Sequence, residues 1–319
     1  MTRSLPLVLV GCFLVGVASA STYQARYAAT DLATEEHRAV SLSWVVWAGT
    51  IGAVVGPNLL NASGQLGMWL GLPQLAGPYV VAGVCLALAA LVLVLFLRPD
   101  PYRLSLRLRE HTGEVVRRPK LREGLTHLRG RPRAVLGIAA IAVGHVVMVM
   151  VMVMTPVHMA HVDVTLQLIG FVISVHVAGM YALSPVVGWA VDRFGRLQVI
   201  SAGVVILALA CGISGVAAGD NVPLLAVGLF LLGLGWSCTL IAGSTLVTDE
   251  VETTERPAVQ GLSDLVMNAA GAVGGAAAGI IVLVSSYGWL CAAGLVPLIG
   301  LVALMASPAC RTHSNMRSM

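Results

Sequence analysis

Four polar side chains lie inside long apolar stretches of this sequence, where they could exchange a proton or bind a ligand. They are His145, His176, Asp264 and Asn268. A carboxylate in an apolar stretch is costly unless it faces protein or water, so it marks a proton or ligand site. Imidazole titrates near neutral pH, which suits histidine to proton exchange. We therefore take these four residues as a candidate path for protons or substrate.

The surroundings of Asp264 can be read in two ways. At 100° per residue, one face of a helix carries Asp264, Asn268, Gly271, Gly275 and Gly279. The glycines on this face suit close packing of helices. Arg256 precedes Asp264 by about 12 Å of helix at 1.5 Å per residue. Asp264 could thus line a substrate path, or it could lie near the membrane surface and pair with an arginine of a loop.

The composition places the whole chain in a membrane. Hydrophobic residues make up 57% and charged residues 11% of the 319 residues, and the mean hydropathy is +0.88. Such a chain must use lipid as solvent. Nine apolar runs are long enough to cross a bilayer: 5–24, 39–61, 77–97, 134–155, 167–187, 197–218, 223–247, 258–283 and 287–307. Because an isolated strand cannot satisfy its backbone in hydrocarbon, we expect an all-α, polytopic bundle of about nine transmembrane helices.

The positions of Lys and Arg orient these runs. If residues 5–24 cross the membrane from outside, 18 of the 19 basic residues fall on one side, and only Arg3 falls on the other. This distribution predicts that the basic side is cytoplasmic. It disfavours a secretory signal peptide, which Val17-Ala18-Ser19-Ala20 imitates. We expect a multi-pass protein of the plasma (inner) membrane, with a cytoplasmic C-terminus and no surface for nucleic acid.

The sequence divides into three parts. Residues 1–97 hold three spans, residues 98–133 form a basic cytoplasmic linker with 11 basic and 4 acidic residues, and residues 134–319 hold six spans. A repeat relates the first part to the last, because Gly11 to Gly16 align with Gly228 to Gly233. After a shift of one residue, Asp31 meets Asp249 and Arg38 falls beside Arg256. These are parallel pseudo-repeated halves, of which the first is incomplete.

A short charged turn between two spans reads G-x-x-x-D-R-x-G-R, with Gly188, Asp192, Arg193, Gly195 and Arg196 at its defined positions. The two glycines allow close approach of helices and a tight turn. Asp192, at the end of one helix, is placed to meet the positive N-terminal end of a neighbouring helix. The arginines hold the turn at the membrane surface. Because such a contact exists in only one packing of the two halves, the turn could be a latch; alternatively, it only carries charges that orient the chain.

This turn resembles the loop between the eighth and ninth helices of the major facilitator superfamily of secondary transporters. The stretch that contains Gly52, Gly56 and Pro57 resembles the family's antiporter-associated motif, although Leu60 and Asn61 replace the glycine pair that usually ends it. The resemblance implies twelve helices in two halves, and this chain matches the last nine of them. It implies alternating access for a small-molecule substrate, and we favour proton-coupled antiport (efflux). A solute:proton symporter, a non-transporting fragment and a membrane-embedded enzyme are the alternatives.

Sequence motifs for enzyme chemistry are missing. The chain contains no nucleophile elbow, phosphate loop or H-E-x-x-H. The six cysteines are scattered singly, without the spacing of a metal site. His158, His161 and Asp163 share one loop, which is weak support for a metal. We therefore expect a protein that is not an enzyme and has no cofactor or metal.

Overall fold

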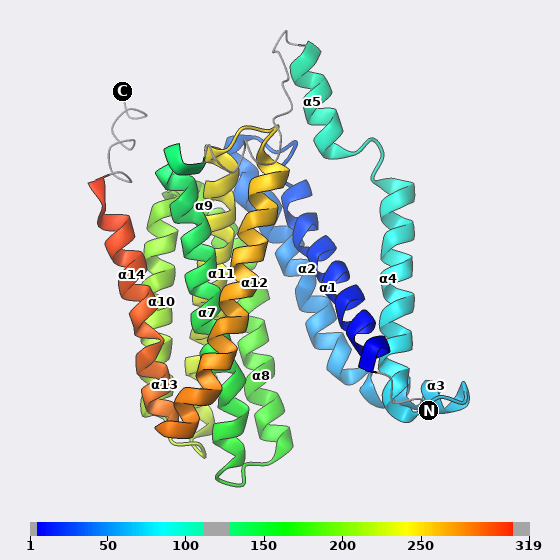
Figure 1. The fold of residues 1–319 in the computed structure, drawn as a ribbon, viewed down its shortest axis with the longest axis vertical. Coiled ribbons are helices and arrows are strands. Elements are labelled where there is room, and N and C mark those ends of the chain that lie inside the picture. Colours follow the sequence, from blue (N-terminus) through cyan, green and yellow to red (C-terminus); the bar gives the residue numbers. More distant parts are fainter. Residues whose placement is uncertain (1–4, 112–127, 309–319) are drawn as a thin grey trace.

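The computed structural model describes residues 5–111 and 128–308, and this part of the chain consists of helices joined by short turns, without a strand (Figure 1). Helices occupy all nine apolar runs in the expected order. They are α1 (Leu5–Ala28), α2 (Arg38–Asn58), α4 (Gly77–Phe96), α7 (Pro132–Ala160), α8 (Leu166–Tyr181) continued by α9 (Ser184–Phe194), α10 (Arg196–Val216), α11 (Val222–Glu250), α12 (Arg256–Val284), and α13 (Tyr287–Ala293) continued by α14 (Leu295–Ala306). The predicted fold class is confirmed.

The helices have the length that a bilayer requires. Within the described residues, seven helical stretches are long and apolar enough to cross a membrane. Helices α1 and α2 have 24 and 21 residues. At 1.5 Å per residue these two helices are about 36 and 31 Å long, which also covers the hydrocarbon core of about 30 Å.

Several short helices were not expected from the sequence. Helix α3 (Leu60–Trp69) follows α2 almost directly, and three 3-10 turns add Glu35–His37 (η1), Gln74–Ala76 (η2) and Leu128–Gly130 (η3). The predicted linker begins with helix α5 (Pro101–His111). Residues 112–127, most of the remaining linker, lie outside the described residues.

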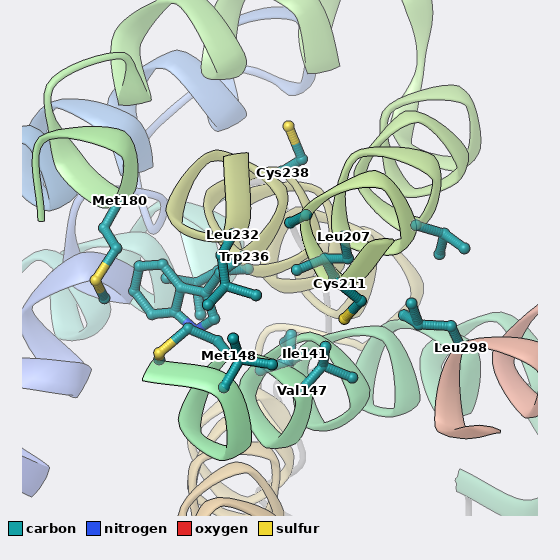
Figure 2. Packing of buried hydrophobic residues seen from close by; sticks show 14 of the residues in the cluster. Ile141, Val147, Met148, Met180, Leu207, Cys211, Leu232, Trp236, Cys238 and Leu298 are labelled. Atoms are coloured by element: carbon teal, nitrogen blue, oxygen red, sulfur yellow. The ribbon is translucent and has the colours of Figure 1, made fainter. Parts of the chain in front are cut away.

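Helices α7 to α14 form one closely packed bundle with α11 at its centre. Helix α11 contacts α7, α8 and α10, and its apolar side chains are buried along most of its length. Glycines bring the backbones together: a Cβ on Gly243 would lie 2.8 Å from the Gly137 carbonyl oxygen, and one on Gly235 would lie 3.1 Å from that of Gly203. Close approach through small residues is the usual way in which membrane helices pack. Figure 2 shows side chains such as Leu207 and Leu232 meeting in this core.

The three N-terminal helices are arranged differently. Helix α2 packs on α8 and α9, α1 packs on α2 and α12, and α4 packs on α3. In Figure 1, α1 and α2 (blue) approach the C-terminal bundle at the end where α9 terminates, and they diverge from it toward α3. We call the near end the charged end, because Arg26, Arg38, Arg196, Asp249 and Arg256 lie in the helix ends and turns there.

Candidate functional site

At the charged end, Asp192 in the last turn of α9 caps the N-terminus of α2. Its carboxylate accepts hydrogen bonds from the backbone N–H groups of Ala39, at 3.2 Å, and Val40, at 2.9 Å. These N–H groups have no partner within their own helix, and the helix dipole favours an anion at this position. The contact predicted for Asp192 with a neighbouring helix N-terminus is confirmed.

The two glycines of the turn serve different purposes. A Cβ on Gly188 would lie 2.6 Å from the Cβ of Ser43 and 2.8 Å from the carbonyl oxygen of Ala39, so only glycine lets α9 approach α2 this closely. Gly195 has a φ of 103°, a backbone conformation that favours glycine. It separates α9 from α10 by one residue and so makes the tight turn.

Asp249, at the end of α11, joins both halves of the chain at the charged end. One of its carboxylate oxygens pairs with Arg38 of α2, and the other accepts a hydrogen bond of 2.8 Å from Nε of Arg196. Arg196 also donates a hydrogen bond of 2.9 Å to the carbonyl oxygen of Glu35. The Arg38 and Asp249 side chains are only 9% and 11% exposed, so this is a largely buried network. Arg193, by contrast, is exposed.

Asp31 lies in the turn between α1 and α2, at the same end. Burial raises the pKa of its carboxyl to about 6, although the positive charge of Arg256 opposes this shift and the negative charge of Asp100 adds to it. Asp31 and Asp249 occupy corresponding positions of the predicted repeat, as do Arg38 and Arg256. Each acid thus lies close to the arginine of the other half.

Between the N-terminal helices and the bundle lies a cavity of about 450 Å³. Helices α1, α2, α7, α8, α11 and α12 all contribute to its wall. The lining residues are Thr22, Tyr23, Ala25, Arg26, Val45, Val46, Gly49, Gly52, Ala53, His145, Met180, Tyr181, Trp236, Leu240 and Met267. A cavity of this size, mostly apolar with a few polar groups, is typical of small-molecule sites.

Asp264 forms a buried ion pair with Arg26, which lines the cavity from the last turn of α1. The two side chains are 10% and 5% exposed. The carboxylate also accepts a hydrogen bond of 3.1 Å from Nε2 of Gln24. Asn268 lies one turn further along α12, where its Nδ2 donates to the Asp264 carbonyl oxygen at 2.7 Å and its Oδ1 accepts a 3.5 Å hydrogen bond from Tyr23. The partner of Asp264 is therefore an arginine of a helix in the other half, and not an arginine of a loop.

Two aromatic rings also line the cavity. The rings of Tyr181 and Trp236 meet edge to face, with centroids 5.8 Å apart. The indole Nε1–H of Trp236 donates a hydrogen bond of 3.1 Å to Nδ1 of His145. Sequence reasoning selected His145 but missed both aromatic residues; the only signal for them was the presence of polar rings within apolar runs.

The chain as a whole can be compared with known proteins. The family model described as the Major Facilitator Superfamily matches it twice, over residues 1–163 and 150–313. The chain belongs to the Major Facilitator Superfamily. It is therefore a multi-pass membrane protein of a family of transporters, not of enzymes.

Curated relatives in this superfamily cover nearly all of the chain. Two of them are uncharacterized MFS-type transporters of Bacillus subtilis: YddS is 36% identical over 93% of this chain and 68% of its own length, and YdeG is 38% identical over 89% and 66%. The riboflavin transporter RfnT of Brucella anthropi is 30% identical over 91% of this chain and 70% of its own length. The chain thus spans about two thirds of the length of these relatives.

Not all of the candidate residues meet in the cavity of this superfamily member. His145 lines it, and Asp264 and Asn268 adjoin it through Arg26 and Tyr23. His176 is buried between α8 and α11, where its Nδ1 lies 2.8 Å from the Leu229 carbonyl oxygen, and it does not line the cavity.

The antiporter-like motif lies on α2, around the cavity's edge. Gly52 borders the cavity, and Gly56 borders a groove that also includes residues of α4. A Cβ on either glycine would meet no atom within 4 Å. Pro57 belongs to the last turn of α2, and its side chain lies outside the described residues. No group of three metal-binding side chains occurs in the described parts of the chain.

Proposed function

We propose that this chain moves a small solute across the plasma membrane by alternating access and that protons drive the movement. The observation that carries the proposal is the ion pair between Arg26 and Asp264, which joins the two halves beside the cavity. A buried ion pair contributes little net stability, because desolvation offsets much of its Coulomb energy. A protonatable carboxylate at this position is better explained by a role in proton coupling.

The contacts at the charged end are the proposed gate. Asp192 and Asp249 on the C-terminal side hold α2, which belongs to the N-terminal side. If the halves rock apart at this end, these contacts break together. The concentration of arginines supports placing this end, the linker and the C-terminus in the cytoplasm. The structure then corresponds to a conformation that is closed on the cytoplasmic side.

The division into parts is proposed on the same basis. Residues 1–97 supply α1, α2 and α4, and residues 134–319 supply nearly all of the compact bundle from α7 to α14. Residues 98–133 connect the two as a linker. This division lets each part move as a body, which alternating access requires.

Antiport (efflux) remains our preferred coupling, on the resemblance of the stretch around Gly52 and Gly56 to the antiporter motif. One observation favours the alternative, a solute:proton symporter. Arg26 both lines the cavity and holds Asp264. A solute that binds Arg26 would compete with the carboxylate, and protonation of Asp264 would remove the competitor. Solute and proton would then bind together.

Proteoliposomes with an imposed pH gradient test both proposals. Because one relative is a riboflavin transporter, riboflavin is the first solute to follow. We expect gradient-driven movement, opposite to proton flow for antiport and along it for symport, and loss of the gradient dependence in Asp264→Asn. The matched control is Asp220→Asn, an exposed aspartate of the α10–α11 turn. Chemical turnover of a solute without directional movement would instead indicate an enzyme.

A further inference from the structure

We propose that the cavity binds a planar aromatic solute that carries a hydrogen-bond acceptor, with the ring packed against Trp236 and Tyr181 and the acceptor bound to Arg26. This inference rests on the proposed transport function and names the class of solute. It uses two features of the cavity that the family membership does not supply: a fixed aromatic wall and an arginine with a free donor.

The aromatic wall is held in place by its own contacts. His145 fixes the indole through the hydrogen bond from Nε1, and Tyr181 meets the indole at an interplanar angle of 84°. Met180 points toward the indole at the edge of the core nearest the N-terminal helices (Figure 2). Aromatic rings prefer offset or edge-to-face contacts with other rings, and methionine adapts to ring surfaces. This wall therefore favours a flat ring system over a saturated one.

The donor is on Arg26. Its side chain is only 5% exposed, and its Nη2 donates hydrogen bonds to the Asp264 carboxylate and to the Tyr27 hydroxyl. Its Nε, however, has no hydrogen-bond partner among the described residues. A buried N–H without a hydrogen-bond partner is unfavourable, because it has lost its bond to water. Because Arg26 lines the cavity, a small shift of its side chain would bring this group to an acceptor on a bound solute, and the charge-assisted hydrogen bond would be strong in an apolar cavity.

The charge of the cavity decides between classes of aromatic solute. Among the residues that the structure describes, Arg26 is the only charged one that lines the cavity, and no carboxylate does so. A cationic solute would lie beside the Arg26 guanidinium and be repelled by it, because the nearby Asp264 carboxylate is already paired with Arg26. A neutral or anionic solute with an acceptor would meet a donor and a positive charge. The cavity should therefore select acceptors over cations.

Equilibrium dialysis with the purified chain in detergent tests this choice with three probes: 2-naphthoate, the saturated decalin-2-carboxylate, and the cationic 2-naphthylmethylammonium. We expect 2-naphthoate to bind about tenfold tighter than either of the others, since a ring contact or a charge-assisted hydrogen bond is worth on the order of one such factor. Trp236→Leu should abolish the preference over decalin-2-carboxylate. Trp289→Leu, at a tryptophan that is 69% exposed and does not line the cavity, is the matched control and should keep it.

Arginine variants test the second half. Arg26→Gln alone leaves Asp264 unpaired and could unfold, so Arg26→Gln is combined with Asp264→Asn. The double variant should lose the preference for 2-naphthoate over the cation, whereas Arg103→Gln, at an exposed arginine of α5, should keep it. Wild-type protein that binds the cation as tightly as 2-naphthoate, or Trp236→Leu that retains its ring preference, overturns the inference. If either result is found together with gradient-driven flux in proteoliposomes, the solute class is wrong but the transport function stands. If the binding preferences are found without any flux, only the transport function is contradicted.

Discussion

The backbone N–H of Val40 donates a hydrogen bond of 2.9 Å to the Asp192 carboxylate, across the interface between α2 and α9. The two residues belong to different halves of the chain, and the bond is not part of the backbone hydrogen bonding of α9, because Asp192 accepts it through its side chain. The bond instead satisfies the first turn of α2, whose N–H groups would otherwise have no protein acceptor. One carboxylate thus joins α9 to α2 and caps the N-terminus of α2.

Asp192→Asn should weaken this link without preventing membrane insertion. Asparagine can still accept a hydrogen bond, but it lacks the charge that the helix dipole favours. A helix cap and its charge are worth about 1 kcal/mol, which shifts the balance between conformations about fivefold. We expect transport to fall by a similar factor in proteoliposomes, at unchanged expression. Equal transport by the variant and the wild type would remove Asp192 from the proposed gate.

Gly188→Ala should disturb the same interface by steric means. The added Cβ would lie 2.6 Å from the Cβ of Ser43, closer than real Cβ atoms come, so α2 must move away from α9. Ser43 is fully buried. A cysteine placed there by Ser43→Cys should react with maleimide faster when Gly188→Ala is also present, as mapped by mass spectrometry.

The control for this steric prediction is Gly212→Ala on α10, where a Cβ would meet nothing within 4 Å. Alanine favours helix over glycine by about 1 kcal/mol, so this change should leave labelling at position 43 unaltered and stability equal or higher. Similar labelling in both glycine variants would show that the α2–α9 contact does not depend on Gly188.

Asp249→Asn should destabilise the protein more than Arg38→Gln does. Asp249 holds both Arg38 and Arg196, so its loss leaves two arginines without this acid, whereas Asp249 retains Arg196 when Arg38 is replaced. Breaking a buried pair from one side costs on the order of 3 to 5 kcal/mol. Thermal unfolding in detergent should rank wild type first, Arg38→Gln second and Asp249→Asn last. The reverse order of the two variants would contradict the shared role of Asp249.

Much of the fold could be predicted because it depends on local composition. Each long apolar run became a helix, and the turn at Gly188 to Arg196 combined positional needs that only particular residues meet: glycine at a close approach, glycine at a positive φ, and an acid beside a helix N-terminus. Helix α3 was missed because Leu60 to Trp69 mixes polar and apolar residues over a stretch too short to cross a membrane.

The cavity could not be predicted in the same way. Asp264 and Arg26 are 238 residues apart, and no periodicity connects α1 with α12. Trp236 lies in a helix that is apolar on all sides, so its sequence does not show which face meets the cavity. His176 and His145 are alike in sequence, yet a single backbone carbonyl holds His176 between two packed helices. Only the packing of distant helices separates these cases.

Asp31 should make the protein more stable in mildly acidic solution. Burial raises the pKa of this carboxyl in the folded protein to about 6, above its ordinary value of 3.8, and the nearby Asp100 adds to the shift while Arg256 opposes it. The folded state therefore binds the proton more tightly than the unfolded state, and stability rises as the pH falls from above 6 toward 4. Above pH 6 the charged, partly buried carboxylate destabilises the fold.

Asp31→Asn should therefore raise the unfolding temperature at pH 7.5. It should also reduce the increase in stability that the wild type shows on acidification, because the variant no longer has the Asp31 carboxyl. The control is Asp163→Asn, at an exposed aspartate of the opposite end whose φ of 57° asparagine also adopts. Asp163→Asn should unfold like the wild type at pH 7.5 and in mildly acidic solution. If Asp31→Asn is less stable than the wild type at pH 7.5, the attraction between Asp31 and Arg256 outweighs the cost of burying the carboxylate.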